Sequence, residues 1–231
     1  MKEYTPIETG LAIFPVMFTL VPCSIATGVI VTRTNNYRYP IWAGWALVTT
    51  ASGISIAWDS ETTTAVWAVT LVILGLGHGA ILNAQSFATQ AMCTQGGEGH
   101  AAAFYAFLRQ FGMAVGVSIG GSAFQNVMAL KLQWQGLPVD IASNSEGFSE
   151  ELSKLPADSE YKKSVVNAYV YGFHGVYILY TAFSALALLL SFLVKRFSLD
   201  KDLSTEHKLQ EGSVFDFITK KRPHKGGRFD L

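Results

Sequence analysis

Five long stretches of hydrophobic residues alternate with shorter polar connections along this chain. They cover residues 11–32, 40–58, 64–92, 101–128 and 165–194. A helix needs about 20 predominantly apolar residues to cross the hydrocarbon core of a bilayer, and the stretches reach or approach that length. Because lipid offers the backbone no hydrogen-bond partners, such segments cross as helices. The pattern therefore predicts an all-α fold, a polytopic transmembrane helix bundle with five spans.

The polar residues divide the chain into a membrane domain and a tail. We expect residues 1–194 to form the transmembrane domain, with an outer loop at 129–164 between the last two spans. Residues 195–231 are expected to form a cytoplasmic tail that is disordered. This tail is rich in charged residues and ends in a basic cluster.

Basic residues near the ends of the spans predict the orientation in the membrane. Short cytoplasmic loops carry an excess of Lys and Arg. Arg33 and Arg38 in the first connection, and the flank Lys195–Arg196, fit this rule if the tail is cytoplasmic. With five spans, the N-terminus then lies outside.

The composition narrows the class of protein further. Hydrophobic residues make up 50% of the 231 residues and charged residues only 15%, with 17 basic and 17 acidic side chains. A soluble domain usually carries about 25% charged residues, and nucleic-acid binding depends on an excess of basic ones. The bilayer is therefore an expected partner and nucleic acid is not. Motifs of phosphate-binding loops, zinc proteases and serine hydrolases do not occur in the sequence, so we expect no enzyme activity, cofactor or metal.

Small residues and prolines mark two segments as candidate contact surfaces. Gly112, Gly116 and Gly120 are spaced by four and form a row on one helical face. Membrane helices associate by close packing, which such rows permit; the row is either a static contact or a surface on which two halves rock. Pro15 and Pro22 interrupt the first segment, either as structural kinks or as a hinge.

Three polar residues in segment 64–92 are candidates for a substrate cavity. His78 lies near the middle of this segment, and Asn83 and Gln85 follow it. Polar side chains at that depth are costly and usually face a bundle interior or a wet cavity. The glycines around His78 are expected to open space beside it. The competing interpretation is a histidine that bonds a neighbouring helix.

One charge, Arg109, lies inside segment 101–128, about two turns from its cytoplasmic end. Its guanidinium either reaches the interface or pairs with a carboxylate on another helix. The five segments contain no Asp or Glu. A carboxylate partner within the membrane would therefore come from a loop or from another chain.

Several motifs resemble those of one transporter family. The stretch from Gly28 through Arg33 to Arg38 resembles the cytoplasmic-loop motif of the major facilitator superfamily, in which a Gly precedes Asp-Arg and a further basic residue. Thr32 replaces the Asp, as in the degenerate second copy of that motif. Further similarity to the fungal fourteen-helix drug:proton antiporter branch lies in residues 41–47 (IWAGWAL), 74–79 (LGLGHG) and 108–112 (LRQFG).

The resemblance implies the C-terminal portion, the last five helices, of a proton-coupled efflux antiporter for amphipathic organic compounds or toxins. It implies that segment 64–92 lines the substrate cavity and that segments 11–32 and 101–128 flank the interface between the two halves. The resemblance implies that the first half of such a transporter, and the start of its second half, are missing from this chain. The expected partners are therefore a small amphipathic organic substrate, protons, and the missing N-terminal helices or a partner chain.

The resemblance also implies a plasma-membrane location, with the vacuolar membrane as the second choice. Because the five segments lack acidic residues, proton coupling would reside mainly in the missing part, with His78 as a contributor. The alternative function is a non-transporting membrane interaction protein or an inactive transporter remnant.

Overall fold

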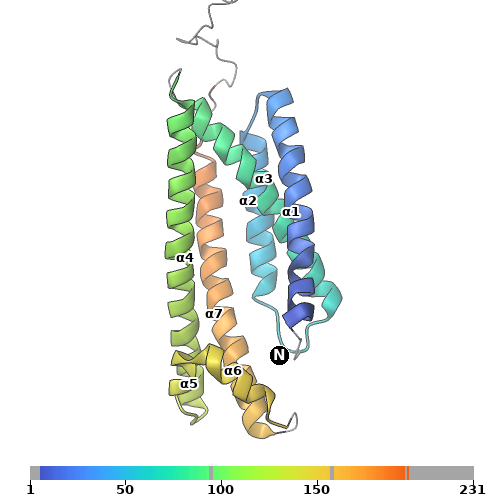
Figure 1. The fold of residues 1–231 in the computed structure, drawn as a ribbon, viewed down its shortest axis with the longest axis vertical. Helices are drawn as coiled ribbons and strands as arrows, with labels where there is room; N and C mark the ends of the chain where they lie inside the picture. The colour runs from blue at the N-terminus through green and yellow to red at the C-terminus, as the bar shows by residue number, and fades with distance from the viewer. Residues whose placement is uncertain (1–5, 94–95, 157–158, 196, 198–231) are drawn as a thin grey trace, which may run out of the picture.

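The structure is a computed structural model that describes residues 6–93, 96–156, 159–195 and 197. Five long helices run through it, each in the opposite direction to the one before (Figure 1). They are α1 (Pro6–Thr34), α2 (Arg38–Ser55), α3 (Thr64–Ala91), α4 (Glu98–Trp134) and α7 (Glu160–Ser191). Two short helices, α5 (Asp140–Ser143) and α6 (Ser145–Ser153), lie between α4 and α7. The all-α prediction is confirmed for the described residues, while the predicted disordered tail lies almost wholly outside them.

Four of the long helices are long and apolar enough to cross a membrane, namely α1, α3, α4 and α7. The predicted span at 40–58 folds as a helix in the expected place, but α2 has only 18 residues and does not meet the same criterion. It begins at the charged Arg38 and ends in the polar Ser55. At about 1.5 Å per residue, a helix of this length is about 27 Å long, slightly shorter than a hydrocarbon core of about 30 Å. A fifth crossing, by α2, therefore stays a prediction.

The helices pack in a fixed order of neighbours. α3 lies between α1 and α2, α2 also packs on α7, and α7 packs on α4. α1 and α4 therefore occupy the two edges of the bundle (Figure 1). We call the end at which α1 finishes and α2 begins the motif end, and the opposite end, which carries α5 and α6, the cap end.

Glycines allow α3 to approach both of its neighbours closely. A Cβ atom on Gly79 would lie 2.6 Å from the Leu20 carbonyl oxygen of α1, and one on Gly75 would overlap Thr19. On the α2 side, a Cβ atom on Gly77 would lie 2.9 Å from the Gly44 carbonyl oxygen. The expectation that these glycines open space beside His78 is therefore wrong, because the neighbouring helices fill that space. They are contact residues of the kind that membrane helices use to associate.

The segment expected to be an outer loop, 129–164, is largely helical and has a hydrophobic core of its own. α4 continues to Trp134 and α7 already begins at Glu160. Between them, α5 and α6 bury apolar side chains against the ends of α4 and α7. This cap cluster consists of Met128, Leu132, Ile141, Ala142, Leu152, Val165, Ala168 and Tyr169. The cap therefore fixes the spacing of α4 and α7 at one end of the bundle.

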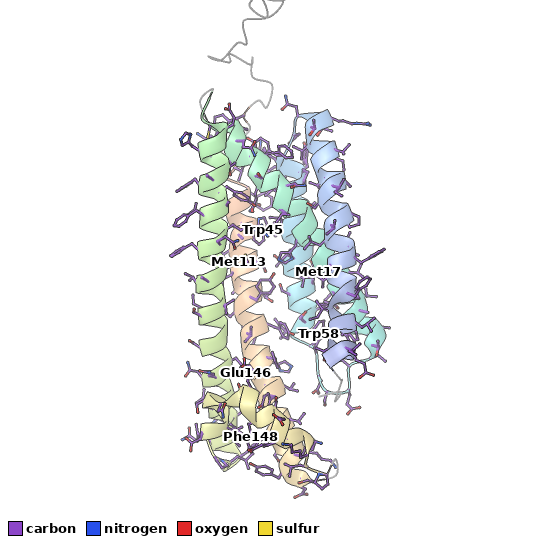
Figure 2. All side chains as sticks on the ribbon, viewed as in Figure 1. Met17, Trp45, Trp58, Met113, Glu146 and Phe148 are labelled. Atoms are coloured by element: carbon purple, nitrogen blue, oxygen red, sulfur yellow. The ribbon has the colours of Figure 1, made fainter. Side chains whose placement is uncertain are left out.

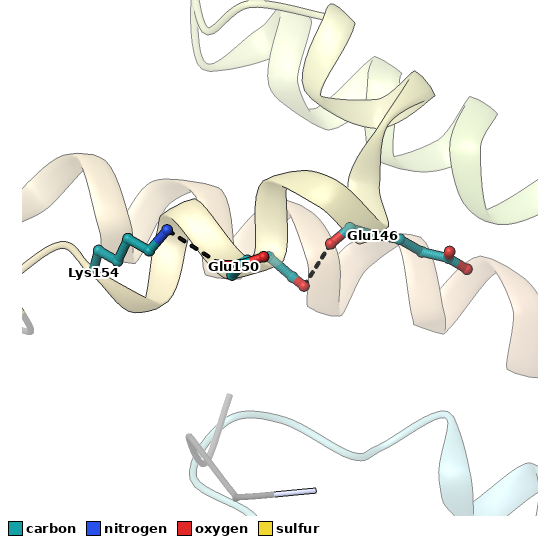
Figure 3. A network of polar contacts seen from close by, with 4 residues as sticks. Glu146, Glu150 and Lys154 are labelled. Atoms are coloured by element: carbon teal, nitrogen blue, oxygen red, sulfur yellow. Dashed lines mark hydrogen bonds and ion pairs between the residues drawn. The ribbon is translucent and has the colours of Figure 1, made fainter.

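A small network of charged and polar side chains lies on α6 of the cap (Figure 3). On α6, Lys154 Nζ lies 3.2 Å from Glu150 Oε1, and both side chains are exposed. Ser149 Oγ donates a hydrogen bond of 2.7 Å to the Glu146 carbonyl oxygen. An exposed ion pair contributes only about 0.2–1 kcal/mol. The buried cluster, not this surface network, therefore holds the cap in place.

Large apolar side chains project outward from the two edge helices (Figure 2). Met17 on α1 and Met113 on α4 are both more than half exposed. So are further apolar side chains on the same helices: Ile7, Leu11, Phe14, Phe18, Val21, Ile25, Ile30, Phe104, Phe107, Phe111 and Val117. Soluble proteins rarely leave such continuous apolar surfaces in water. Lipid, or other transmembrane helices, must cover them.

Candidate functional site

His78 on α3 is hydrogen-bonded at both ring nitrogens. Its Nδ1 lies 3.0 Å from the Leu74 carbonyl oxygen of the same helix, and its Nε2 lies 3.0 Å from Tyr180 Oη on α7. Because a carbonyl oxygen only accepts, Nδ1 carries the hydrogen, and in the neutral ring Nε2 accepts from the Tyr180 hydroxyl. The two rings also stack, with an interplanar angle of 11°. The structure thus shows the bond to a neighbouring helix, and contact of His78 with a substrate stays a prediction.

Asn83 bonds the helix on the other side of α3. Its Nδ2 donates a hydrogen bond of 2.7 Å to the Ser24 carbonyl oxygen of α1. Gln85, two residues further along α3, is half-buried. His78 and Asn83 therefore bond different helices and are not brought to one site. Their predicted role, and that of Gln85, in a substrate cavity remains a prediction.

Replacing Asn83 by leucine tests the link between α3 and α1. We expect Asn83→Leu to destabilise the bundle by about 1 kcal/mol, because the Ser24 carbonyl loses its side-chain partner. Unfolding of the purified protein in mixed detergent micelles measures this. Asn126→Leu, at an exposed position of α4, is the matched control. Equal stability of the two variants would contradict the interhelical bond.

The loop-motif residues lie at the motif end of the bundle. Gly28 is half-buried in α1, and its carbonyl oxygen accepts a hydrogen bond of 2.8 Å from Thr32 Oγ1. Arg33 is exposed near the end of α1. Arg38 begins α2 and holds its guanidinium carbon 4.7 Å from the centre of the Trp42 ring. This cation–π contact directs Arg38 along α2 rather than into solvent.

Tyr37 was not singled out as a site residue by the sequence, yet it is the central polar contact of the motif end. It is 1% exposed. Its hydroxyl donates a hydrogen bond of 2.8 Å to the Lys195 carbonyl oxygen and accepts one of 2.8 Å from the Phe197 backbone N–H. Nearby, Trp42 Nε1 donates to the Ser191 carbonyl oxygen at 2.9 Å. The partners lie about 150 residues away in the chain, so no local signal predicts them.

The glycine row of α4 has no neighbour among the residues that the structure describes. A Cβ atom built on Gly112, Gly116 or Gly120 would meet no atom within 4 Å among the described residues. Pro15 is half-buried and Pro22 exposed in α1, which runs unbroken through both. The predicted role of these five residues at an interface between halves stays a prediction.

Arg109 is exposed on α4, within the same open stretch. In the part of the chain that the structure describes, no carboxylate forms an ion pair with it. Both interpretations of this charge, reaching the interface or pairing with another chain, therefore remain open. Among the described residues, no group of three His, Cys, Asp or Glu side chains is placed to hold a metal ion.

The sequence of this chain is similar to those of several fungal transporters. The chain is 33% identical over 220 residues to the MFS transporter L2 of Phoma sp., covering 92% of this chain and 36% of that protein. It is 27% identical over 217 residues to the efflux pump FUS6 of Gibberella moniliformis, covering 91% of this chain and 38% of that protein. It is 28% identical over 214 residues to the acurin A biosynthesis cluster MFS-type transporter of Aspergillus aculeatus, covering 89% of this chain and 38% of that protein.

The chain thus spans little more than a third of the length of these curated relatives. No protein-family model matches the chain. No solved structure matches it either.

Proposed function

Because this chain belongs to the major facilitator superfamily of transporters, we propose that it forms the C-terminal part of a proton-coupled efflux antiporter for amphipathic organic compounds or toxins. One observation carries this proposal: 92% of the chain aligns at 33% identity with a transporter of which it covers only 36%. Further relatives are named efflux pumps, which supports export as the direction of transport.

Such a transporter needs more helices than this chain contains. Alternating access requires two repeats that move about a site between them, and the described residues hold five long helices. The open faces of α1 and α4 are the natural places for the missing helices or a partner chain. We therefore place Gly112, Gly116 and Gly120, with Pro15 and Pro22, at the interface between the halves. The open space beside the three glycines among the described residues supports that placement.

The residue that carries the proton belongs, in this proposal, mainly to the missing part. The apolar segments of this chain contain no Asp or Glu. His78 is the titratable side chain near the middle of α3, and its bond to Tyr180 gives it a polar partner there. A histidine can change its charge near neutral pH. We therefore assign His78 a secondary role in coupling.

The proposed location is the plasma membrane, with the vacuolar membrane as the alternative. The motif end, which carries Arg33 and Arg38, would face the cytoplasm, and the cap end would face outward. The N-terminus would then lie outside and the C-terminal tail inside. Arg33 and Arg38 in the short connection, and the Lys195–Arg196 flank in the sequence after α7, support this orientation.

A dye-export assay tests the proposed activity. The upstream genomic sequence is first read for further hydrophobic segments in frame, and the longer protein and the present chain are each expressed in yeast that lacks its own drug pumps. We expect the longer protein to lower accumulation of the amphipathic dye rhodamine 6G several-fold, and a protonophore to abolish the effect. The present chain alone should not change accumulation. An upstream frame without hydrophobic segments, or unchanged accumulation with the longer protein, would contradict the proposal.

The alternative is a non-transporting membrane interaction protein or an inactive remnant. The same unpartnered glycine row favours it, because a single partner helix could fill that face. Purification from membranes in mild detergent distinguishes the two. A stable partner that is lost in Gly116→Leu, together with no dye export by any form of the protein, would support the alternative.

A further inference from the structure

The backbone just after α7 is hydrogen-bonded to the helix bundle. Two backbone groups just beyond this helix, the Lys195 carbonyl and the Phe197 N–H, both bind the Tyr37 hydroxyl at 2.8 Å. A single hydroxyl thus acts as donor to one group and acceptor from the other, which uses both of its hydrogen-bonding functions. Both groups lie outside the helix, so this contact is not part of the helical ladder.

The Tyr37 ring is anchored in a buried cluster at the motif end. This cluster contains Val31, Tyr37, Ile41, Ala84, Ala88 and Ala91, and Val194 packs against it. α1, α2 and α3 all contribute to it, so the hydroxyl is held by three helices at once. By contrast, the Lys195 and Phe197 side chains are exposed. The Tyr37 hydroxyl therefore binds the backbone of the segment, while the Val194 side chain packs against the cluster.

We propose that the connection between α1 and α2 is a docking site for the segment that follows α7, and that the Tyr37 hydroxyl is the latch that closes it. The latch ties the backbone at Lys195 and Phe197 to the start of α2. This inference concerns the assembly of the chain itself and holds whether or not the protein transports.

The latch is separable from the packing of α2 on α7. Further along these helices, Trp42 Nε1 donates to the Ser191 carbonyl, and the hydroxyls of Ser52 and Ser184 lie 3.3 Å apart. The Trp42 and Phe192 rings are also in contact, with centroids 5.4 Å apart. Loss of the Tyr37 hydroxyl alone leaves all of these contacts in place. The segment should then be released without separation of the helices.

Backbone hydrogen exchange of the full purified chain, in nanodiscs, tests this directly. The Phe197 N–H donates to the latch, so its exchange in the unaltered protein should be slowed at least about ten-fold relative to an unstructured peptide. In Tyr37→Phe we expect this exchange to become roughly ten-fold faster, since a net hydrogen bond typically changes an equilibrium by about that factor. Exchange in α3 should not change. Trypsin cleavage after Lys195, whose carbonyl the latch binds, should accelerate in parallel.

Tyr39→Phe is the matched control, because Tyr39 is 66% exposed and touches the same Trp42 ring. It should leave both readouts unchanged. The proposal is overturned if the Phe197 N–H of the unaltered protein exchanges as in a free peptide. It is also overturned if Tyr37→Phe and Tyr39→Phe behave alike, or if Tyr37→Phe accelerates exchange throughout α3, since the hydroxyl would then not act as a local latch.

Discussion

Replacing Gly79 by alanine is expected to destabilise the bundle by about 1–3 kcal/mol, the usual cost of forcing extra volume into a packed contact. The added Cβ atom would lie 2.6 Å from the Leu20 carbonyl oxygen and 2.9 Å from Cys23 Cβ. The first of these is backbone, so α1 as a whole must move away from α3. Such a shift also weakens the nearby bond from Asn83 to the Ser24 carbonyl.

The measurement is the stability of Gly79→Ala in mixed detergent micelles, compared with Gly112→Ala. Both changes place the same methyl group on a helical glycine, and both gain the higher helix propensity of alanine. A Cβ on Gly112 meets nothing within 4 Å in the described chain, so Gly112→Ala should be neutral or slightly stabilising. Equal stability of the two variants would show that α1 and α3 do not approach as closely as the structure has them.

Leu132→Ala should lower the free energy of unfolding by about 3 kcal/mol and loosen the packing of the cap. Leu132 is fully buried in the cap cluster, among residues of α4, α5, α6 and α7. Removing its side chain to alanine leaves a cavity that short helices such as α5 cannot close without losing their other contacts. Helices this short form only when tertiary packing supports them. We therefore expect hydrogen exchange across α5 and α6 to accelerate strongly while the motif end stays protected.

Leu130→Ala provides the control for this change. Leu130 lies two residues away on α4 and is 50% exposed, so its truncation removes the same atoms from a surface position. Exchange in the cap should then remain as in the unaltered protein. A Leu132→Ala protein with a fully protected cap would contradict the view that the buried cluster holds the cap in place.

The long helices were predictable because their signal is local. Each apolar stretch contains enough residues to indicate a membrane helix by itself, and its position in the sequence gives the position of the helix. α2 is the borderline case: Arg38 and Ser55 at its ends shorten the apolar part, so length alone does not decide whether it crosses. The family resemblance rested on short motifs that also remain together in the sequence.

The glycines around His78 show what a local pattern leaves undecided. A glycine in a membrane helix indicates either a cavity or a close helix contact, and the sequence of one helix does not tell which neighbour fills the space. Gly75 and Gly79 have the same spacing of four as the row in α4. That spacing was an available signal for a helix contact. In α3 this spacing forms a contact with α1, whereas in α4 the row meets no atom within 4 Å in the described part of the chain.

The cap and the polar contacts of the motif end were missed for a different reason. In segment 129–164 the charged residues are frequent enough to indicate a loop, and its short helices depend on a cluster whose members come from four elements. The bonds from Tyr37 and Trp42 join groups about 150 residues apart. Such contacts depend on the order in which the helices pack, which follows from the whole fold and not from any one segment.

Side-specific labelling of single cysteines tests most directly the claim that five helices cross the membrane. With Cys23 and Cys93 replaced by serine, one cysteine is placed at an exposed site in or beside each connection: Thr34→Cys and His100→Cys at the motif end, and Ser60→Cys and Ser143→Cys at the cap end. With a membrane-impermeant maleimide, we expect Ser60→Cys and Ser143→Cys to react in intact cells. Thr34→Cys and His100→Cys should react only after permeabilisation. Reaction of Thr34→Cys and Ser60→Cys from the same side would show that α2 does not cross, and would contradict the five-span bundle.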